Sequence, residues 1–217
     1  MTQSSQVRSR VWLAAGCALI AGVALGAGGA RALGGDDGPD SSATVTLPEQ
    51  LDGMRPEADV IAEVVGGSDN AGAQETVRKR QTVRDEATVT LSAAYGGATT
   101  AGAAYSDDEL ETSVTVFAVA ATSPGLWSSQ DTESAPEILN LATPMEWVEV
   151  DGDAQCLTRP QTPYREGTDP ADIESYVVRC QVSAEDHTVI LEVQGSQMPP
   201  ERGLELVQLA ADEVEIG

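Results

Sequence analysis

An uncharged apolar run at residues 11–30 constrains this chain more than any other feature. Twenty helical residues at ~1.5 Å each span ~30 Å, the thickness of a bilayer core. Charges of opposite sign flank the run: Arg8 and Arg10 before it, Asp36 and Asp37 after it. Because positive charge favours the cytoplasmic side, we expect a cytoplasmic tail at 1–10 and a transmembrane signal anchor at 11–33. The remaining chain is expected to be extracytoplasmic.

Two other fates of this segment stay open. Cleavage as a secretory signal near the small residues at 30–32 would release the domain. Residues 13–17 (Leu-Ala-Ala-Gly-Cys) resemble a lipobox, but only six apolar residues, 11–16, precede Cys17. A lipoprotein signal needs an apolar region of about 7–15 residues before its cysteine. The uncleaved anchor therefore fits the length and the flanking charges best.

Small residues recur every four positions inside the predicted anchor, and Gly22 and Gly26 form a GxxxG pair. Such a stripe lets two helices approach closely in lipid, so self-association through these glycines is one expectation. Alanine and glycine are common throughout the sequence, however, and the stripe also has this simpler explanation.

The exported part is strongly acidic. All 35 acidic residues lie at or after Asp36, and the whole chain has a formal net charge of −23. Such a surface repels nucleic acid, so no nucleic-acid partner is expected. It also keeps an exported domain soluble. Aromatic residues make up only 4%, so the core must rely on Val, Leu, Ile and Ala.

Local patterns predict one α+β domain over 47–217, after a flexible Gly/Asp/Ser-rich stalk at 34–46. Helices are expected at 55–67, 74–86, 134–142 and 199–215, the last with Leu204, Val207, Ala211 and Val214 on its apolar face. Strands are expected at 87–95, before Tyr105, and at 112–121, with hairpins at 145–158 and 175–193. The run at 112–121 is apolar on both faces, as in a central strand. This order predicts a mainly antiparallel sheet with flanking helices.

Two cysteines lie in neighbouring predicted hairpins, Cys156 in one and Cys180 in the next. In an exported domain this placement predicts a structural disulfide. Cys180 is expected to share the apolar face with Tyr176, Val178 and Val182. The spacing is too wide for a Cys-x-x-Cys redox pair, and a zinc site would need more Cys or His.

The sequence contains no recognisable catalytic motif. His187 is the only histidine and falls in a predicted turn, where a solvated surface position is expected. Two carboxylate clusters could serve a hydrolase or hold calcium: Asp107, Asp108, Glu109 and Glu111, and Asp151 with Asp153. Neither matches a calcium-loop pattern, and nearby carboxylates are expected by chance in so acidic a chain. We therefore expect no enzyme activity, cofactor or metal.

Four basic residues form a cluster in the predicted helix at 74–86: Arg78, Lys79, Arg80 and Arg84. It is the only basic cluster outside the predicted anchor, so it is a candidate docking site for an anionic partner. A solvated helix face is the alternative, with Glu75 and Lys79 four residues apart as a pair.

Several segments resemble a type of membrane-anchored exported protein of high-GC Gram-positive bacteria: "LPEQLDGMR", "SAAYGG", "VTVFAVAATSPG", "QCLTRP" and "VVRCQ". The order of elements resembles a PsbP/Mog1-like sandwich. These resemblances imply location and fold, and they imply no activity.

The expected function is therefore a membrane-tethered extracytoplasmic domain with a non-catalytic interaction or accessory role at the cell envelope, acting with an envelope protein partner. The alternative is a binding module for a small apolar ligand or a metal ion, held between sheet and helix. An enclosed apolar pocket would favour the binding module, and an exposed apolar patch would favour the interaction protein.

Overall fold

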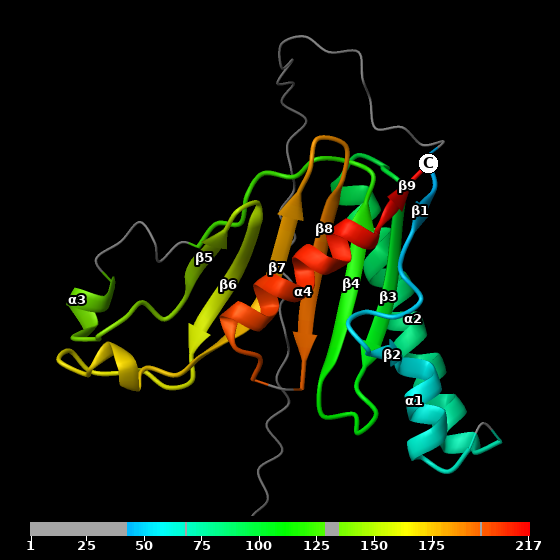
Figure 1. Ribbon diagram of the computed structural model, residues 1–217, viewed down its shortest axis with the longest axis horizontal. Coiled ribbons are helices and arrows are strands. Elements are labelled where there is room, and N and C mark those ends of the chain that lie inside the picture. The colour runs from blue at the N-terminus through cyan, green and yellow to red at the C-terminus, as the bar shows by residue number, and fades with distance from the viewer. Residues whose placement is uncertain (1–42, 68, 129–134, 196) are drawn as a thin grey trace, which may run out of the picture. The chain divides into compact units, whose positions relative to one another are not determined.

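A computed structural model describes residues 43–217 apart from 68, 129–134 and 196 (Figure 1). These residues form an α+β unit with a seven-stranded antiparallel sheet, in the order β2-β3-β4-β8-β7-β6-β5, and flanking helices. This is the class of domain that the sequence predicts. The 1–10 tail, the 11–33 anchor with Gly22 and Gly26, and most of the stalk lie outside the described residues. Among the described helices, none is long and apolar enough to cross a membrane.

The elements have the following bounds. The strands of the main sheet are β2 (Arg55–Pro56), β3 (Thr100–Ser106), β4 (Ser113–Val119), β5 (Trp147–Asp151), β6 (Ala154–Pro160), β7 (Ser175–Ser183) and β8 (Thr188–Gln194). The helices are α1 (Glu57–Val64), α2 (Ala71–Ala94), α3 (Ala135–Leu139) and α4 (Pro200–Glu213). A separate two-stranded sheet joins β1 (Val45–Thr46) to β9 (Glu215–Ile216).

The central strand and both hairpins lie where the sequence predicts them. Every residue of β4 is buried, and β4 pairs with β3 on one side and β8 on the other. The turn between β5 and β6 includes Gly152, whose φ of 58° is the left-handed conformation that glycine adopts without strain. The prediction of a central strand at 112–121, made from its two apolar faces, is therefore confirmed.

The predicted strand at 87–95 is wrong, because these residues extend α2 to Ala94. Asn70 caps the helix by accepting the backbone N–H groups of Gly72 and Ala73. Threonine hydroxyls then donate to the carbonyl four residues earlier, including those of Thr88 and Thr90 inside the predicted strand. The alternating Thr and Val suggested a strand, but the helix already started upstream continues through them.

The C-terminal helix also ends earlier than predicted. α4 stops at Glu213, and Glu215 and Ile216 pair with Thr46 and Val45. Backbone bonds in both directions between Thr44 and Gly217, at 2.7 and 3.0 Å, extend this pairing. Val45 and Thr46, at the end of the predicted stalk, therefore contact the last residues of the domain.

The main core lies between α4 and one face of the sheet, which α4 crosses in front of β6, β7 and β8 (Figure 1). The fully buried side of α4 consists of Gly203, Leu206, Val207 and Ala210. Of the four residues predicted for the apolar face of this helix, only Val207 is fully buried. Leu204, Ala211 and Val214 are partly buried at the margin of the core, so the buried face is rotated about the helix axis from the predicted one. The rotation brings a glycine, rather than a larger side chain, against the sheet.

Cys156 and Cys180 lie opposite each other on β6 and β7 and form a disulfide beneath α4. Both are completely buried. The face predicted for Cys180 was correct at Val182 and wrong at Tyr176 and Val178, because the register shifts at Val178 and puts Val177 into the core instead. A β-bulge of this kind adds one residue to a strand and reverses the alternation beyond it.

Gly203 allows α4 to lie directly on this disulfide. A Cβ at position 203 would lie 2.9 Å from Cys180 Sγ and 2.7 Å from Val177 Cγ2. Gly203→Ala should therefore lower the free energy of unfolding by about 1–3 kcal/mol, as expected for overpacking a core. Chemical denaturation measures this change. The control Glu205→Ala, on the exposed side of α4, should change it by less than ~0.5 kcal/mol, and equal effects would contradict the close contact.

Tyr105 makes the stability of the domain sensitive to alkaline pH. Its ring is buried, and its hydroxyl donates to the carbonyl of Pro48 at 2.6 Å. Burial, with a smaller contribution from the negative charge of Glu213, raises the pKa of Tyr105 to about 12. A raised phenol pKa means that folding disfavours the ionised form, so its stabilisation is complete below pH ~10 and declines above it.

The free energy of unfolding should therefore fall as the pH rises from ~10 towards ~12, and Tyr105→Phe should remove this part of the slope. Denaturant titrations of both proteins at stepped pH measure the difference. Parallel pH profiles for the two proteins would show that the phenol ionises equally well in the folded chain.

Candidate functional site

α2 is the longest described helix, and most of its residues are not buried by the rest of the fold. The helix is described in full, and only Ala73 of its 24 residues is buried. Val83 and Val89 on it are 67% and 70% exposed. It lies behind β3 and β4, on the opposite face of the sheet from α4 (Figure 1). Any role of this face of the domain therefore involves α2.

A missing side chain sets the distance between α2 and the sheet. A Cβ on Gly102 of β3 would lie 2.9 Å from Thr88 Oγ1 and 2.9 Å from the ring of Phe117. Gly102 thus lets Thr88 rest beside the only phenylalanine of the chain. The helix covers the sheet only around this contact of Gly102, Thr88 and Phe117. The part of the sheet surface towards β8 is not covered by the helix.

A cavity of about 250 Å³ lies at this margin, between α2 and the outer faces of β3, β4 and β8. We call it the α2–sheet cavity. Its apolar wall consists of Val83 and Ala87 from the helix and Ala104 and Phe117 from the strands. Its polar lining comes from β4, β8 and the two helices α1 and α2, and consists of Glu57, Lys79, Arg80, Arg84, Thr115, Glu192 and Gln194.

The predicted basic cluster divides between the two sides of α2. Arg78 and Lys79 are exposed, and both pair with Glu75, the lysine at 3.4 Å. Exposed pairs of this kind contribute ~0.2–1 kcal/mol and separate readily. These two cations are therefore accessible to a partner.

The other two basic residues line the α2–sheet cavity. Arg80 pairs with Glu57, whose side chain is only 6% exposed. Arg84 donates to the neutral side chain of Gln81. Its Nε is buried and has no hydrogen-bond partner among the described residues. The four basic residues thus have different surroundings, which the sequence did not indicate: Arg78 borders the hollow between α1 and α2, whereas Lys79, Arg80 and Arg84 line the α2–sheet cavity.

A second, more open hollow lies between α1 and α2. It has a volume of about 410 Å³, and Ala58, Ala62, Ala73 and Val77 supply most of its apolar lining. Arg78 contributes to its rim. The exposed side chains of Val64 and Val65 follow at the end of α1. The hollow thus offers an open apolar surface beside the exposed Arg78.

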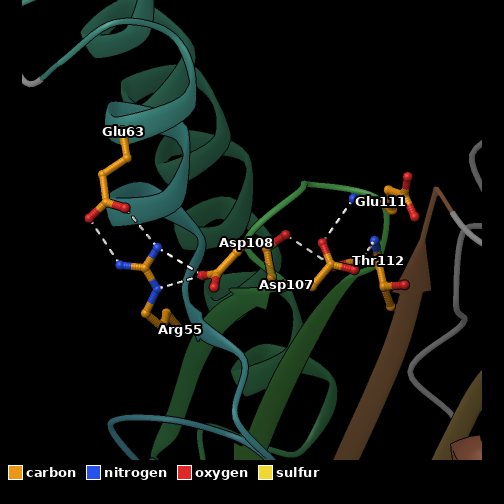
Figure 2. A network of polar contacts seen from close by, with 7 residues as sticks. Arg55, Glu63, Asp107, Asp108, Glu111 and Thr112 are labelled. Atoms are coloured by element: carbon orange, nitrogen blue, oxygen red, sulfur yellow. Dashed lines mark hydrogen bonds and ion pairs between the residues drawn. The ribbon is translucent and has the colours of Figure 1, made fainter.

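The first predicted carboxylate cluster holds the β3–β4 loop together (Figure 2). Asp107 accepts the backbone N–H groups of Glu111 and Thr112, each at 2.9 Å. Asp108 accepts the Arg55 guanidinium at 2.9 Å. These contacts give both aspartates a structural role in the loop.

Arg55 joins that loop to α1. Its guanidinium forms a two-bond pair with the carboxylate of Glu63, at 2.9 and 2.8 Å (Figure 2). Hydrogen bonding to Arg55, aided by its charge, holds the pKa of Glu63 below its usual value. Hydrogen bonding to Glu63, and to a lesser extent to Asp108, raises the pKa of Arg55. The arginine is thus shared between two acids on different elements.

The structure gives neither carboxylate cluster a metal-binding arrangement. Asp151 and Asp153 flank Gly152 in the β5–β6 turn and are exposed. Within the described part of the chain, no group of three or more His, Cys, Asp or Glu side chains could hold a metal ion. The calcium hypothesis therefore has no geometric support in these residues.

His187 is more covered than its predicted turn position suggested. It lies between β7 and β8, its side chain is 17% exposed, and Nδ1 lies 2.7 Å from Asp186 Oδ1. Hydrogen bonding to His187 lowers the pKa of Asp186. The contact joins adjacent residues of one turn, so we assign it to the local conformation of the turn.

Comparisons of the chain with protein-family models, curated proteins and solved structures found no significant match. The fold and the site are therefore interpreted from their own geometry. The resemblance to exported proteins of high-GC Gram-positive bacteria and to the PsbP/Mog1-like sandwich stays a prediction.

The disulfide predicts a specific thiol count for the full chain. Denatured but unreduced protein should have one reactive thiol at most, that of Cys17, and reduction should expose two more. Opening the loop between Cys156 and Cys180, which are 24 positions apart, should lower the free energy of unfolding by ~3 kcal/mol. Mass-labelling with a maleimide and denaturant titration measure the two effects. Three reactive thiols before reduction would contradict the pairing.

Proposed function

We propose that this chain is a membrane-tethered extracytoplasmic domain with a non-catalytic interaction role at the cell envelope. The observation that supports the proposal is the uncovered surface of α1 and α2, defined by the apolar hollow between them and the exposed cations beside it. A 24-residue helix with one buried residue exposes far more surface than packing requires. Exposed apolar surface bordered by polar residues is typical of interaction sites.

The chemistry of this surface defines the partner. Ala58, Ala62 and Val77 offer an apolar contact, and Arg78 and Lys79 offer positive charge in a domain that is otherwise strongly acidic. We infer an envelope protein that presents an apolar segment flanked by acidic residues. Docking of this kind uses the two most exposed members of the four-residue basic cluster, Arg78 and Lys79.

The apolar run before Asp36 supports a membrane location for this interaction. An uncleaved anchor would keep the domain beside its partner and raise the local concentration of both. Mass spectrometry of the membrane-extracted chain distinguishes the anchored form from the secreted alternative. A mature protein beginning near residue 31 would replace the tethered proposal with a secreted one, and one beginning at a lipidated Cys17 would replace the helix with a lipid anchor.

Site-specific photocrosslinking in intact membranes tests the docking surface. A photoreactive residue at Thr82, beside the α1–α2 hollow, should capture a distinct envelope protein, whereas one at Asp212 on exposed α4 should not. Arg78→Glu with Lys79→Glu should reduce the Thr82 adduct several-fold, because the charge reversal repels an acidic partner. Adduct yield is measured by quantitative mass spectrometry after affinity capture.

The matched control is Arg165→Glu, a charge reversal at another exposed arginine, which should leave the adduct unchanged. Capture of the chain by itself alone at Thr82 would replace the partner with a second copy. Equal capture at Thr82 and Asp212 would contradict a specific surface.

A further inference from the structure

Arg84 is exceptional among the cations of this domain. Every other lysine and arginine in the described part of the chain, apart from the exposed Arg165, has a carboxylate within ion-pair distance. Arg84 is half-buried and has none there. In a chain with 35 acidic residues, a half-buried arginine without a carboxylate needs a specific explanation.

The hydrogen bonding of Arg84 leaves one donor unused. Its terminal nitrogen donates to Gln81, but its buried Nε has no acceptor among the described residues. Buried polar groups in folded proteins are nearly always hydrogen-bonded, and a bound water or ion is one of the usual partners of a group that has none in the protein. An arginine side chain presents its donors in a planar fork that suits a carboxylate oxygen.

The other charged side chains that line the α2–sheet cavity each have a partner of opposite charge. Arg80 pairs with Glu57, and Glu192 pairs with Arg179 at 3.3 Å. Lys79 pairs with Glu75 on its own helix. Arg84 is therefore the one cation lining the cavity that lacks a carboxylate partner among the described residues. The cavity matches a ligand with a single negative charge.

The rest of the lining determines the body of that ligand. Val83 and Ala87 form one apolar wall, and Ala104 and Phe117 form the other. Gln194 donates to Thr115 Oγ1 at 3.2 Å, so the polar groups of β4 and β8 at the cavity already bond to each other. A volume of about 250 Å³ limits the ligand to a small molecule.

We propose that the α2–sheet cavity binds a small organic monoanion, with its carboxylate on Arg84 and its apolar body between α2 and Phe117. The site shares only Lys79 with the proposed docking surface, and its recognition of a carboxylate by Arg84 does not depend on that surface. It also uses residues from three parts of the sequence, since Arg84, Ala104 and Phe117 belong to α2, β3 and β4.

Calorimetric titration of the full chain in lipid nanodiscs tests this proposal, with empty nanodiscs as the blank. The probes are phenylacetate, its uncharged analogue phenylacetamide, and inorganic phosphate. Phenylacetate should bind the native chain at millimolar concentration or below, and the other two at least about tenfold more weakly. Phenylacetamide lacks the negative charge of phenylacetate, and inorganic phosphate lacks its apolar ring, so each probe tests one part of the proposed recognition.

Arg84→Met should weaken phenylacetate binding by about tenfold or more, because it removes the charge and the donors together. The same variant should leave the melting temperature of the unliganded domain unchanged or raised, since the orphaned Nε is removed. A merely structural arginine would instead lower it. The matched control Arg165→Met, at the exposed arginine without a carboxylate, should change neither quantity.

Three results would overturn the proposal. They are no phenylacetate binding to the native chain, equal binding to Arg84→Met, and equal binding of phenylacetamide. Phosphate binding as tightly as phenylacetate would also reject an organic ligand in favour of a simple anion site.

Discussion

The contact of Gly203 with the Cys156–Cys180 disulfide is the constraint on which the main core depends. Two neighbouring hairpins each contribute one cysteine, and the bond between them fixes β6 against β7. α4 can then cross these strands at close range only because position 203 has no side chain. The register shift beside Cys180 belongs to the same arrangement, because it turns Val177 towards the helix. The disulfide, the bulge in β7 and Gly203 together therefore determine how closely α4 packs on the sheet.

Helices cover the two faces of the sheet to different degrees. On the α4 face, Leu206, Val207 and Ala210 fill the space over the strands. On the other face α2 covers β3 and β4 and leaves a cavity towards β8. A domain of this size gains most of its stability from one well-packed core. The cavity on the second face is the one lined by Arg84, a cation without a carboxylate partner among the described residues.

Much of the fold could be predicted from local sequence, and most of the site could not. Hairpins depend on alternation and turn residues, such as Gly152, that act over a few positions. The helical state of Thr88 and Thr90 depends instead on a helix started at Asn70, many residues away. The division of the basic cluster depends on where Glu57 and Phe117 lie, and neither is close to it in sequence. Contacts between distant segments leave no local pattern.

The sequence by itself determined the uncharged run at 11–30, the acidic character of the chain from Asp36 onward, the central position of 113–119 and the cysteine pair. These features follow from composition and short-range periodicity. Only the tertiary structure decided that Gly203 meets the disulfide, and that Arg84 turns away from Arg78 to line a cavity without a carboxylate partner among the described residues. The physical reason is that an arginine's partner is set by which elements pack beside it, and that packing is a property of the whole domain.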